Sequence, residues 1–244
     1  MKRPVLVLLL LLMAVLPVRA QRADGPVHLS AGLAVGTTGL GLEASVLLPS
    51  EIGFRAGFNW LQAGIPLSAK LPEDFGGDGS SLNFKAKLNL NHGYLLTDIY
   101  LTPKGRFHLT GGVWAGSPVL VRLSNTSPLP DALNSIGIDV DDYSVHAVDG
   151  NLTAELRVNA VKPYLGVGFG RPRDDRHWTV SFDAGILFWG NPGVFSTGYN
   201  LLDEAKEVQL TSAALDGVDK GILDKVGRVM VYPVLRCVVS YRIF

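Results

Sequence analysis

Residues 40–60 read LGLEASVLLPSEIGFRAGFNW, and this stretch decides the fold. On both sides of Pro49-Ser50, apolar residues occupy every second position, and the positions between them hold small, polar or charged residues. Successive side chains of a strand point to opposite faces, so this period of two predicts two β-strands joined by a turn at Pro49-Ser50. Each predicted strand carries one charge near its middle, Glu43 in the first and Arg55 in the second, on the face opposite the apolar one.

The same alternation continues through most of the chain. The phase of the pattern slips by one residue at Asn91-His92-Gly93 and again near Lys162-Pro163, and we interpret each slip as a β-bulge inside a strand. The sequence therefore predicts an all-β fold, an antiparallel up-and-down barrel of about eight strands, or ten if the slips are turns. The predicted runs are 29–35, 40–48, 52–60, 82–101, 107–115, 152–158 with its continuation past Lys162-Pro163, 178–188 and 229–243.

The N-terminus has the features of a secretory signal peptide. Lys2 and Arg3 precede an apolar stretch from Val5 to Leu16, and Val18-Arg19-Ala20 ends in the small residue that a signal peptidase requires. We expect residues 1–20 to be cleaved and residues 21–244 to form one domain. The residue directly after the cleavage site is Gln21 and not cysteine, so a lipoprotein anchor is not expected.

The charge balance excludes a nucleic-acid partner. The first twenty residues hold three of the 22 Lys and Arg residues and none of the 22 acidic ones, which leaves 19 − 22 = −3 after cleavage. Cys237 is the only cysteine, so it cannot form an intramolecular disulfide, and its place in an alternating run predicts a position on an apolar strand face.

Several features of the strands favour a transmembrane barrel over a soluble β-sandwich or a lipocalin-like barrel. No run of 18 apolar residues follows residue 20, and a closed barrel is the only other structure that pairs all its backbone groups inside lipid. The apolar face continues for about ten residues per strand, which spans a bilayer when the strand is tilted. The opposite face carries charges that we expect to form an ion-paired plug of the lumen: Glu43, Arg55, Lys85, Lys87, Glu155, Arg157 and Asp183.

Connection lengths are asymmetric, as is typical of outer-membrane barrels. Connections at 49–51, 102–105 and 171–176 are short and fall on the predicted periplasmic side. The predicted external connections are the tight turn 36–39 and three long loops at 62–80, 116–151 and 200–227. Apolar residues at helical spacing within 201–227 predict an amphipathic helix that caps the mouth of the barrel.

The chain ends Val239-Ser240-Tyr241-Arg242-Ile243-Phe244, which resembles the C-terminal signal that outer-membrane barrels present to their assembly machinery. Tyr241 and Phe244 fall on opposite faces of the strand, whereas the usual pattern places the two aromatic residues on one face. Longer pieces resemble an uncharacterised family of Gram-negative outer-membrane β-barrel proteins. These pieces are Val35–Glu43, Lys162–Gly170, Phe182–Phe188 with Gly190-Asn191-Pro192, and Tyr232–Leu235.

The resemblance implies a barrel in the cell outer membrane, with outer-membrane lipid and the assembly machinery as partners, and it implies no catalytic residues. We expect a monomer without cofactor or bound metal, in a structural, surface-interaction or narrow-passage role. The alternatives are a barrel enzyme that modifies lipid A or phospholipid, and a soluble periplasmic lipid-binding barrel.

One residue set could support catalysis. His28 and Ser30 share a strand face and Glu43 lies on the neighbouring strand, so the three could form a nucleophile, base and orienting acid. They lie on the polar face, however, whereas lipid substrates would arrive from outside, so a structural role is the preferred interpretation.

Two other patterns give weaker indications. Asp139, Asp141 and Asp142 could contact Ca²⁺, but the glycine and glutamate of an EF-hand loop are missing and a solvated acidic loop is preferred. Gly166, Gly168 and Gly170 precede no predicted helix, so they are interpreted as strand glycines rather than a phosphate-binding loop.

Overall fold

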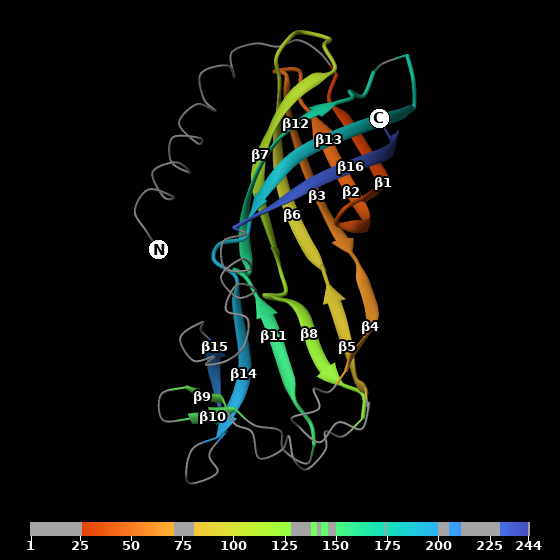
Figure 1. The fold of residues 1–244 in the computed structure, drawn as a ribbon. Helices are drawn as coiled ribbons and strands as arrows, with labels where there is room; N and C mark the ends of the chain where they lie inside the picture. Colours follow the sequence, from red (N-terminus) through yellow and green to blue (C-terminus); the bar gives the residue numbers. More distant parts are fainter. Residues whose placement is uncertain are drawn as a thin grey trace, which may run out of the picture.

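The structure is a computed structural model that describes residues 26–70, 81–127, 138–140, 143–145, 150–173, 175–199, 205–210 and 230–243. Eight strands close into a barrel in the order β1-β16-β13-β12-β7-β6-β3-β2, and every neighbouring pair is antiparallel (Figure 1). The predicted eight-stranded antiparallel barrel is thus confirmed. The barrel strands are β1 His28–Gly36, β2 Gly39–Leu47, β3 Ile52–Trp60, β6 His92–Tyr100, β7 Phe107–Gly116, β12 Val161–Phe169, β13 Trp178–Phe188 and β16 Val231–Arg242.

The two ends of the barrel differ. At the end that we call the near end, β1 begins, β16 ends, and the short connections 48–51, 101–106 and 170–177 join neighbouring strands. At the far end, only β1 and β2 are joined by a tight turn. Gly39 takes a φ of 93° there, a left-handed conformation that glycine adopts without steric cost, and a Cβ at this position would lie 2.2 Å from the Trp60 carbonyl oxygen.

Beyond the far end, a second sheet continues the barrel wall, and we call it the distal sheet. Its order is β4-β5-β8-β11-β14-β10-β9, with β15 paired to β14. β4, β5, β8, β11 and β14 extend β3, β6, β7, β12 and β13, so the barrel order is repeated (Figure 1). Its strands are β4 Gln62–Lys70, β5 Ser81–Asn89, β8 Val119–Asn125, β9 Ile138–Val140, β10 Tyr143–Val145, β11 Thr153–Arg157, β14 Gly193–Tyr199 and β15 Ala205–Leu210.

The distal sheet corrects the prediction of long external loops. The connections predicted at 62–80, 116–151 and 200–227 contain strands over much of their described length. Among the described residues the sheet does not close, because the β1–β2 hairpin turns at Gly39 and no described strand extends it.

The predicted helix at 201–227 is wrong in its described part. Residues 205–210 form β15, in which Lys206 to Leu210 pair with Gly198 to Val194 of β14. Val208 is buried while Glu207 and Gln209 are exposed. Burial therefore alternates with the period of two of a strand, although the apolar residues are also spaced as in a helix. The remainder of the predicted helix lies outside the described residues. No helix in the described part of the chain is long and apolar enough to cross a membrane.

The predicted bulges at 91–93 and 162–163 are also wrong. Pairing between 52–70 and 81–99 keeps one register throughout, and pairing of β12 with β7 is regular across Pro163. Even-numbered residues face inward along both β5 and β6, as the buried Leu90, His92 and Tyr94 show. What changes is chemistry: the apolar face of the distal sheet points inward, whereas in the barrel the outward face is apolar and the inward face carries the buried charges. The apparent slip therefore marks the boundary at which the apolar face moves from inside to outside.

Two apolar clusters fill the far half of the barrel interior. One is built around Trp114, whose ring stacks on that of Tyr94 with 4.8 Å between ring centroids. The centroid of the Tyr164 ring lies 6.0 Å from that of Trp114. The other, around Leu90, Leu120 and Val158, closes the junction with the distal sheet, with Trp189 and Tyr232 packed against it.

Candidate functional site: a charge network across the lumen

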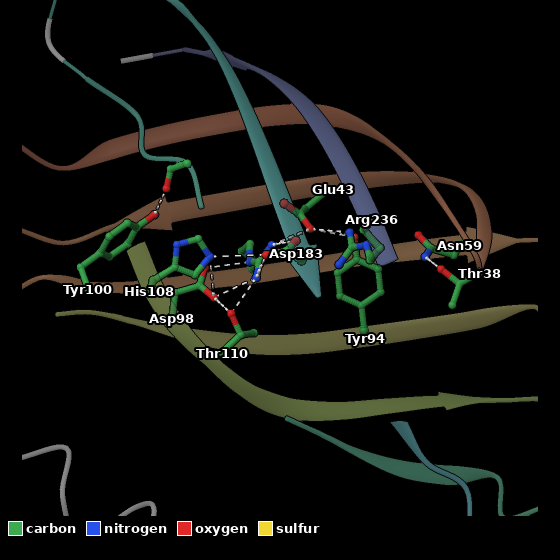
Figure 2. Close-up of polar contacts among 12 residues, drawn as sticks. Thr38, Glu43, Asn59, Tyr94, Asp98, Tyr100, His108, Thr110, Asp183 and Arg236 are labelled. Atoms are coloured by element: carbon green, nitrogen blue, oxygen red, sulfur yellow. Dashed lines mark hydrogen bonds and ion pairs between the residues drawn. The ribbon is translucent and has the colours of Figure 1, made fainter. Parts of the chain in front are cut away.

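The inward faces of five barrel strands carry charged side chains near the middle of the lumen. Glu43 lies on β2, Arg55 on β3, Asp98 on β6, Asp183 on β13 and Arg236 on β16, and all five are buried. Together with Tyr94, His108 and Thr110, which contact them, these residues form what we call the lumen network (Figure 2). Strand alternation places them inward, because their sequence neighbours carry the apolar outer face.

Arg55 is the centre of the network. Its Nη1 donates to Asp183 Oδ2 at 2.7 Å and its Nη2 to Asp183 Oδ1 at 3.1 Å. On the other side Nη2 donates to Asp98 Oδ1 at 2.8 Å, and Nε lies 2.8 Å from Asp98 Oδ2. Thr110 also donates to Asp98, at 2.7 Å. β3 and β13 are opposite one another in the eight-stranded order, so the Arg55–Asp183 pair crosses the whole lumen.

A second crossing lies beside the first. Arg236 Nη2 donates to Glu43 Oε2 at 2.8 Å and to the Tyr94 hydroxyl at 2.7 Å, and Tyr94 donates to the same Glu43 oxygen at 2.9 Å. The Arg236 guanidinium also lies over the rings of Tyr94 and Trp114. β6 and β16 are again opposite in the barrel order, so Tyr94 and Arg236 span the lumen a second time.

The near end of the lumen is closed separately. His108 Nε2 lies 3.4 Å from Asp183 Oδ1, and Tyr100 donates its hydroxyl to the Gly170 carbonyl oxygen at 3.2 Å. Arg171 lies over the Tyr100 ring at 4.7 Å and pairs with Glu51. These contacts tie the 170–177 connection across the barrel opening.

The predicted lumen plug is right for three residues and wrong for four. Glu43, Arg55 and Asp183 meet in the lumen as expected. Lys85, Lys87, Glu155 and Arg157 lie on the distal sheet instead. The error arose because the change of the apolar face from inward to outward was interpreted as a bulge. The polar face of the distal sheet in fact points outward to solvent and not into the lumen.

Glu155 organises its own group of charges on that outward face. Arg122 Nε donates to Glu155 Oε1 and Arg157 Nε to Oε2, both at 2.7 Å, and Arg157 also pairs with Glu207. Burial alone would raise the pKa of the Glu155 carboxyl, but hydrogen bonds from the two arginines outweigh it and hold the pKa below its ordinary value.

A pH prediction follows from this shift. Because the pKa of Glu155 is lower in the folded sheet, its contribution to stability is present above the ordinary pKa of 4.5 and is lost as the pH falls through the folded value. We expect the protection of amides in β8 and β11, measured as the exchange rate relative to the unstructured chain at the same pH, to fall below pH 4.5 more in the wild type than in Glu155→Gln. Parallel profiles for the two proteins would contradict this assignment.

The candidate catalytic set is only partly assembled. His28, Ser30 and Glu43 all point inward, and the register places Ser30 opposite Ser45 and Glu43 opposite Gly32. The Glu43 carboxylate accepts hydrogen bonds from Tyr94 and Arg236, so it serves the lumen network. The inward direction also separates all three from any lipid on the outer face.

The other sequence candidates have simpler outcomes. Asp141 and Asp142 lie outside the described residues, as do the side-chain contacts of Asp139, and the described residues contain no group of three potential metal ligands. Gly166 and Gly168 are strand residues of β12, and Gly170 follows that strand directly. Cys237 is a free cysteine on β16, on the same strand face as Leu235 and Val239.

Sequence reasoning missed several members of the network. Tyr94, Asp98, His108 and Thr110 occupy the same alternating positions as Arg55 does in its strand, and this signal was available. Lys162 was missed as well. It is 0% exposed and pairs across the ladder with Trp114, and within the described part of the chain its Nζ contacts the Ala160 carbonyl oxygen alone, at 3.5 Å.

Comparison with known proteins gives likeness in structure only. No family model matches the chain, and no curated protein matches it in sequence. Among solved structures, CarO2 of Acinetobacter baumannii is 18% identical with a TM-score of 0.47, over 89% of this chain and 100% of that one. CarO of the same organism is 19% identical with a TM-score of 0.44, over 91% and 100% of the two chains.

A major outer membrane protein from Thermus thermophilus is 14% identical with a TM-score of 0.41, over 89% of this chain and 100% of that one. At these values the likeness carries no function across. The eight-stranded barrel is established by its own strand pairing, whereas the particular family suggested by the sequence stays a prediction.

Proposed function

We propose that this chain is a non-enzymatic outer-membrane protein whose barrel is closed to general diffusion and whose distal sheet faces the cell exterior. The observation that carries the proposal is the Arg55 guanidinium, which joins Asp98 to Asp183 across the full lumen. Buried ion pairs of this geometry cannot be opened by a passing solute without exposing an unpaired charge. The Tyr100–Gly170 contact and the two apolar clusters add closures on both sides of the network.

The outer surface of the barrel supports the membrane location. Large apolar side chains remain exposed on all eight strands, among them Leu33, Leu42, Leu95 and Leu165. Aromatic residues gather at both margins, as in the girdles of outer-membrane barrels. Phe58 and Trp60 lie toward the far end, and Phe107, Phe169, Trp178 and Tyr241 toward the near end.

The orientation follows from the asymmetry of the two ends. Outer-membrane barrels have short periplasmic turns and longer extracellular extensions. The near end therefore belongs in the periplasm and the distal sheet outside. Export by cleavage before Gln21, recognition of the last strand by the assembly machinery, and a monomeric state are parts of the same proposal.

The first test is location and folding. We expect the protein in sucrose-gradient outer-membrane fractions, beginning at Gln21, with an unboiled form that migrates faster on SDS gels than the boiled one. A protein that remains soluble in the periplasm would refute the proposal. Identical lipid A mass spectra with and without the gene would support the absence of lipid-modifying activity.

The second test is permeability. Liposomes that contain the folded protein should swell in sugar solutions no faster than empty liposomes, because paired side chains of the lumen network cross the interior of an eight-stranded barrel. Channel activity in planar bilayers should be absent or confined to small ions. Rapid swelling by disaccharides would show that the network does not close the barrel.

A further inference from the structure

The outward face of the distal sheet contains a groove of about 500 Å³ that the proposed function does not use. It lies over β4, β5 and β8, three strands that are hydrogen-bonded neighbours. We call it the basic groove, because Lys85, Lys87 and Arg122 line it and no acidic residue does. The other lining residues are Gln62, Ala63, Gly64, Leu88, Asn89, Ser117 and Val119.

The basic groove is on the same surface as the exposed apolar residues of the barrel, such as Leu33, Leu42, Leu95 and Leu165. We call these residues the apolar belt. One unbroken register joins 52–70 to 81–99, so the face that carries Leu95 and Ile99 in the barrel carries Lys87 and Lys85 in the distal sheet. Both lysines are exposed, and Lys87 pairs with Gly64. Beyond the belt this face continues through Gly93, Asn91 and Asn89, and the two lysine side chains follow.

The height of the basic groove matches a headgroup layer. Gly64 follows the belt residue Trp60 by four positions, which is about 13 Å along a strand and about 10 Å along the membrane normal at a tilt of about 40°. The polar headgroup region extends about 5–8 Å beyond the hydrocarbon on each side. Lys87 pairs with Gly64 and its flexible side chain covers the remaining distance, whereas Lys85 pairs with Pro66, two positions farther out.

Two of the three charges that line the basic groove, those of Lys85 and Lys87, are not neutralised locally. Lys85 and Lys87 make no ion pair within the described residues, whereas Arg122 shares Glu155 with Arg157. Gly64 keeps the space beside the lysines open, since a Cβ there would lie 3.1 Å from the Lys85 Cε atom. Two unpaired ammonium groups at alternate positions of one strand attract an anion with more than one negative oxygen.

We infer that the basic groove binds the phosphate groups of lipopolysaccharide in the outer leaflet. This inference rests on the proposed outer-membrane location. Lipopolysaccharide fits because its acyl chains would lie on the belt, next to Phe58 and Leu95, while its phosphates reach the level of Lys85 and Lys87. A free phosphate ion would gain nothing from the adjoining apolar surface.

The test compares two double variants of the full-length folded protein in detergent. Lys85→Gln/Lys87→Gln removes the unpaired charges of the basic groove, and Lys104→Gln/Arg176→Gln removes two charges from the near end. Each is titrated with lipopolysaccharide, with the same lipid after enzymatic dephosphorylation, and with inorganic phosphate. A membrane-surface lysine contributes about 1 kcal/mol, so we expect Lys85→Gln/Lys87→Gln to bind about 30-fold more weakly. The near-end variant should bind like the wild type.

Three results would overturn the inference: equal loss in both double variants, wild-type binding that is unaffected by dephosphorylation, or equally tight binding of inorganic phosphate. Heat-modifiability and fractionation are measured on the same preparations. A protein that is a heat-modifiable outer-membrane barrel yet fails the titration contradicts only the basic groove, whereas a soluble protein contradicts the proposed function itself.

Discussion

Replacing Arg55 with alanine should cost about 3–5 kcal/mol of unfolding free energy, the largest single effect that we expect in the barrel interior. The substitution leaves Asp98 and Asp183 buried with no guanidinium between them. Equilibrium urea unfolding in lipid vesicles, followed by loss of the heat-modifiable form, measures the change. Arg55→Lys should recover only part of the loss, because an ammonium cannot donate to two carboxylates with the fork geometry of arginine.

Arg122→Ala is the matched control for this prediction. Arg122 also donates to a carboxylate, that of Glu155, but its side chain is 56% exposed. Water screens such a pair, so its loss should cost between about 0 and 1 kcal/mol. Equal losses for the two arginines would mean that the lumen is wet and the network is not a closure.

A triple variant keeps the prediction testable if Arg55→Ala does not fold. Arg55→Met with Asp98→Asn and Asp183→Asn removes the charge and the counter-charges together. Replacing a whole buried ionic group is often close to neutral in stability, so this variant should fold. Its failure to fold would show that packing around Arg55, rather than charge, holds the strands together.

Much of the barrel could be predicted from period-two alternation alone. The hairpin at 40–60 forms with Leu42 opposite Phe58, and Glu43 and Arg55 face inward as expected. Short connections and the tight turn at Gly39 were also predictable, because glycine and proline have local conformational preferences that need no tertiary context.

The distal sheet could not be predicted in the same way. Residues 62–70 contain Pro66 and Gly64, and residues 62–68 are exposed throughout, so the segment lacks the clear alternation of a strand with one buried face. β15 has residues at helical spacing but pairs with β14 over six positions, and these tertiary contacts override local propensity.

The inversion of the apolar face has a physical cause that links fold to location. Along β5 and β6, Phe84 and Leu88 face inward while Leu95 and Ile99 face outward, without any shift in register. Water on the outside favours the first arrangement and lipid on the outside favours the second. A soluble barrel gives no reason for this change. The inversion therefore marks where the chain passes from water to lipid, and a chain whose apolar residues stayed on one face would show no such mark.

Arginine substitutions on the two sides of this boundary should therefore lower the unfolding free energy by different amounts. Leu42 on β2 is 55% exposed and Ile65 on β4 is 52% exposed, so in water either residue should tolerate arginine nearly equally. Leu42 lies halfway along the β1–β2 hairpin, within the apolar belt, where arginine in lipid costs about 2–4 kcal/mol. Ile65 lies beyond the boundary on the edge strand of the distal sheet, where it pairs with Ala86 on the inward face but remains half exposed to water.

We expect Leu42→Arg to lower the unfolding free energy in phosphatidylcholine vesicles by about 2–4 kcal/mol and to reduce assembly in cells. Ile65→Arg should change the unfolding free energy by less than about 0.5 kcal/mol, as for an ordinary surface position. Detergent micelles of short chain length should narrow the difference, since they adapt around a charge more easily than a bilayer does. If both variants lose the same free energy, the outer face of the barrel does not contact lipid, and its exposed leucines must be covered by protein instead.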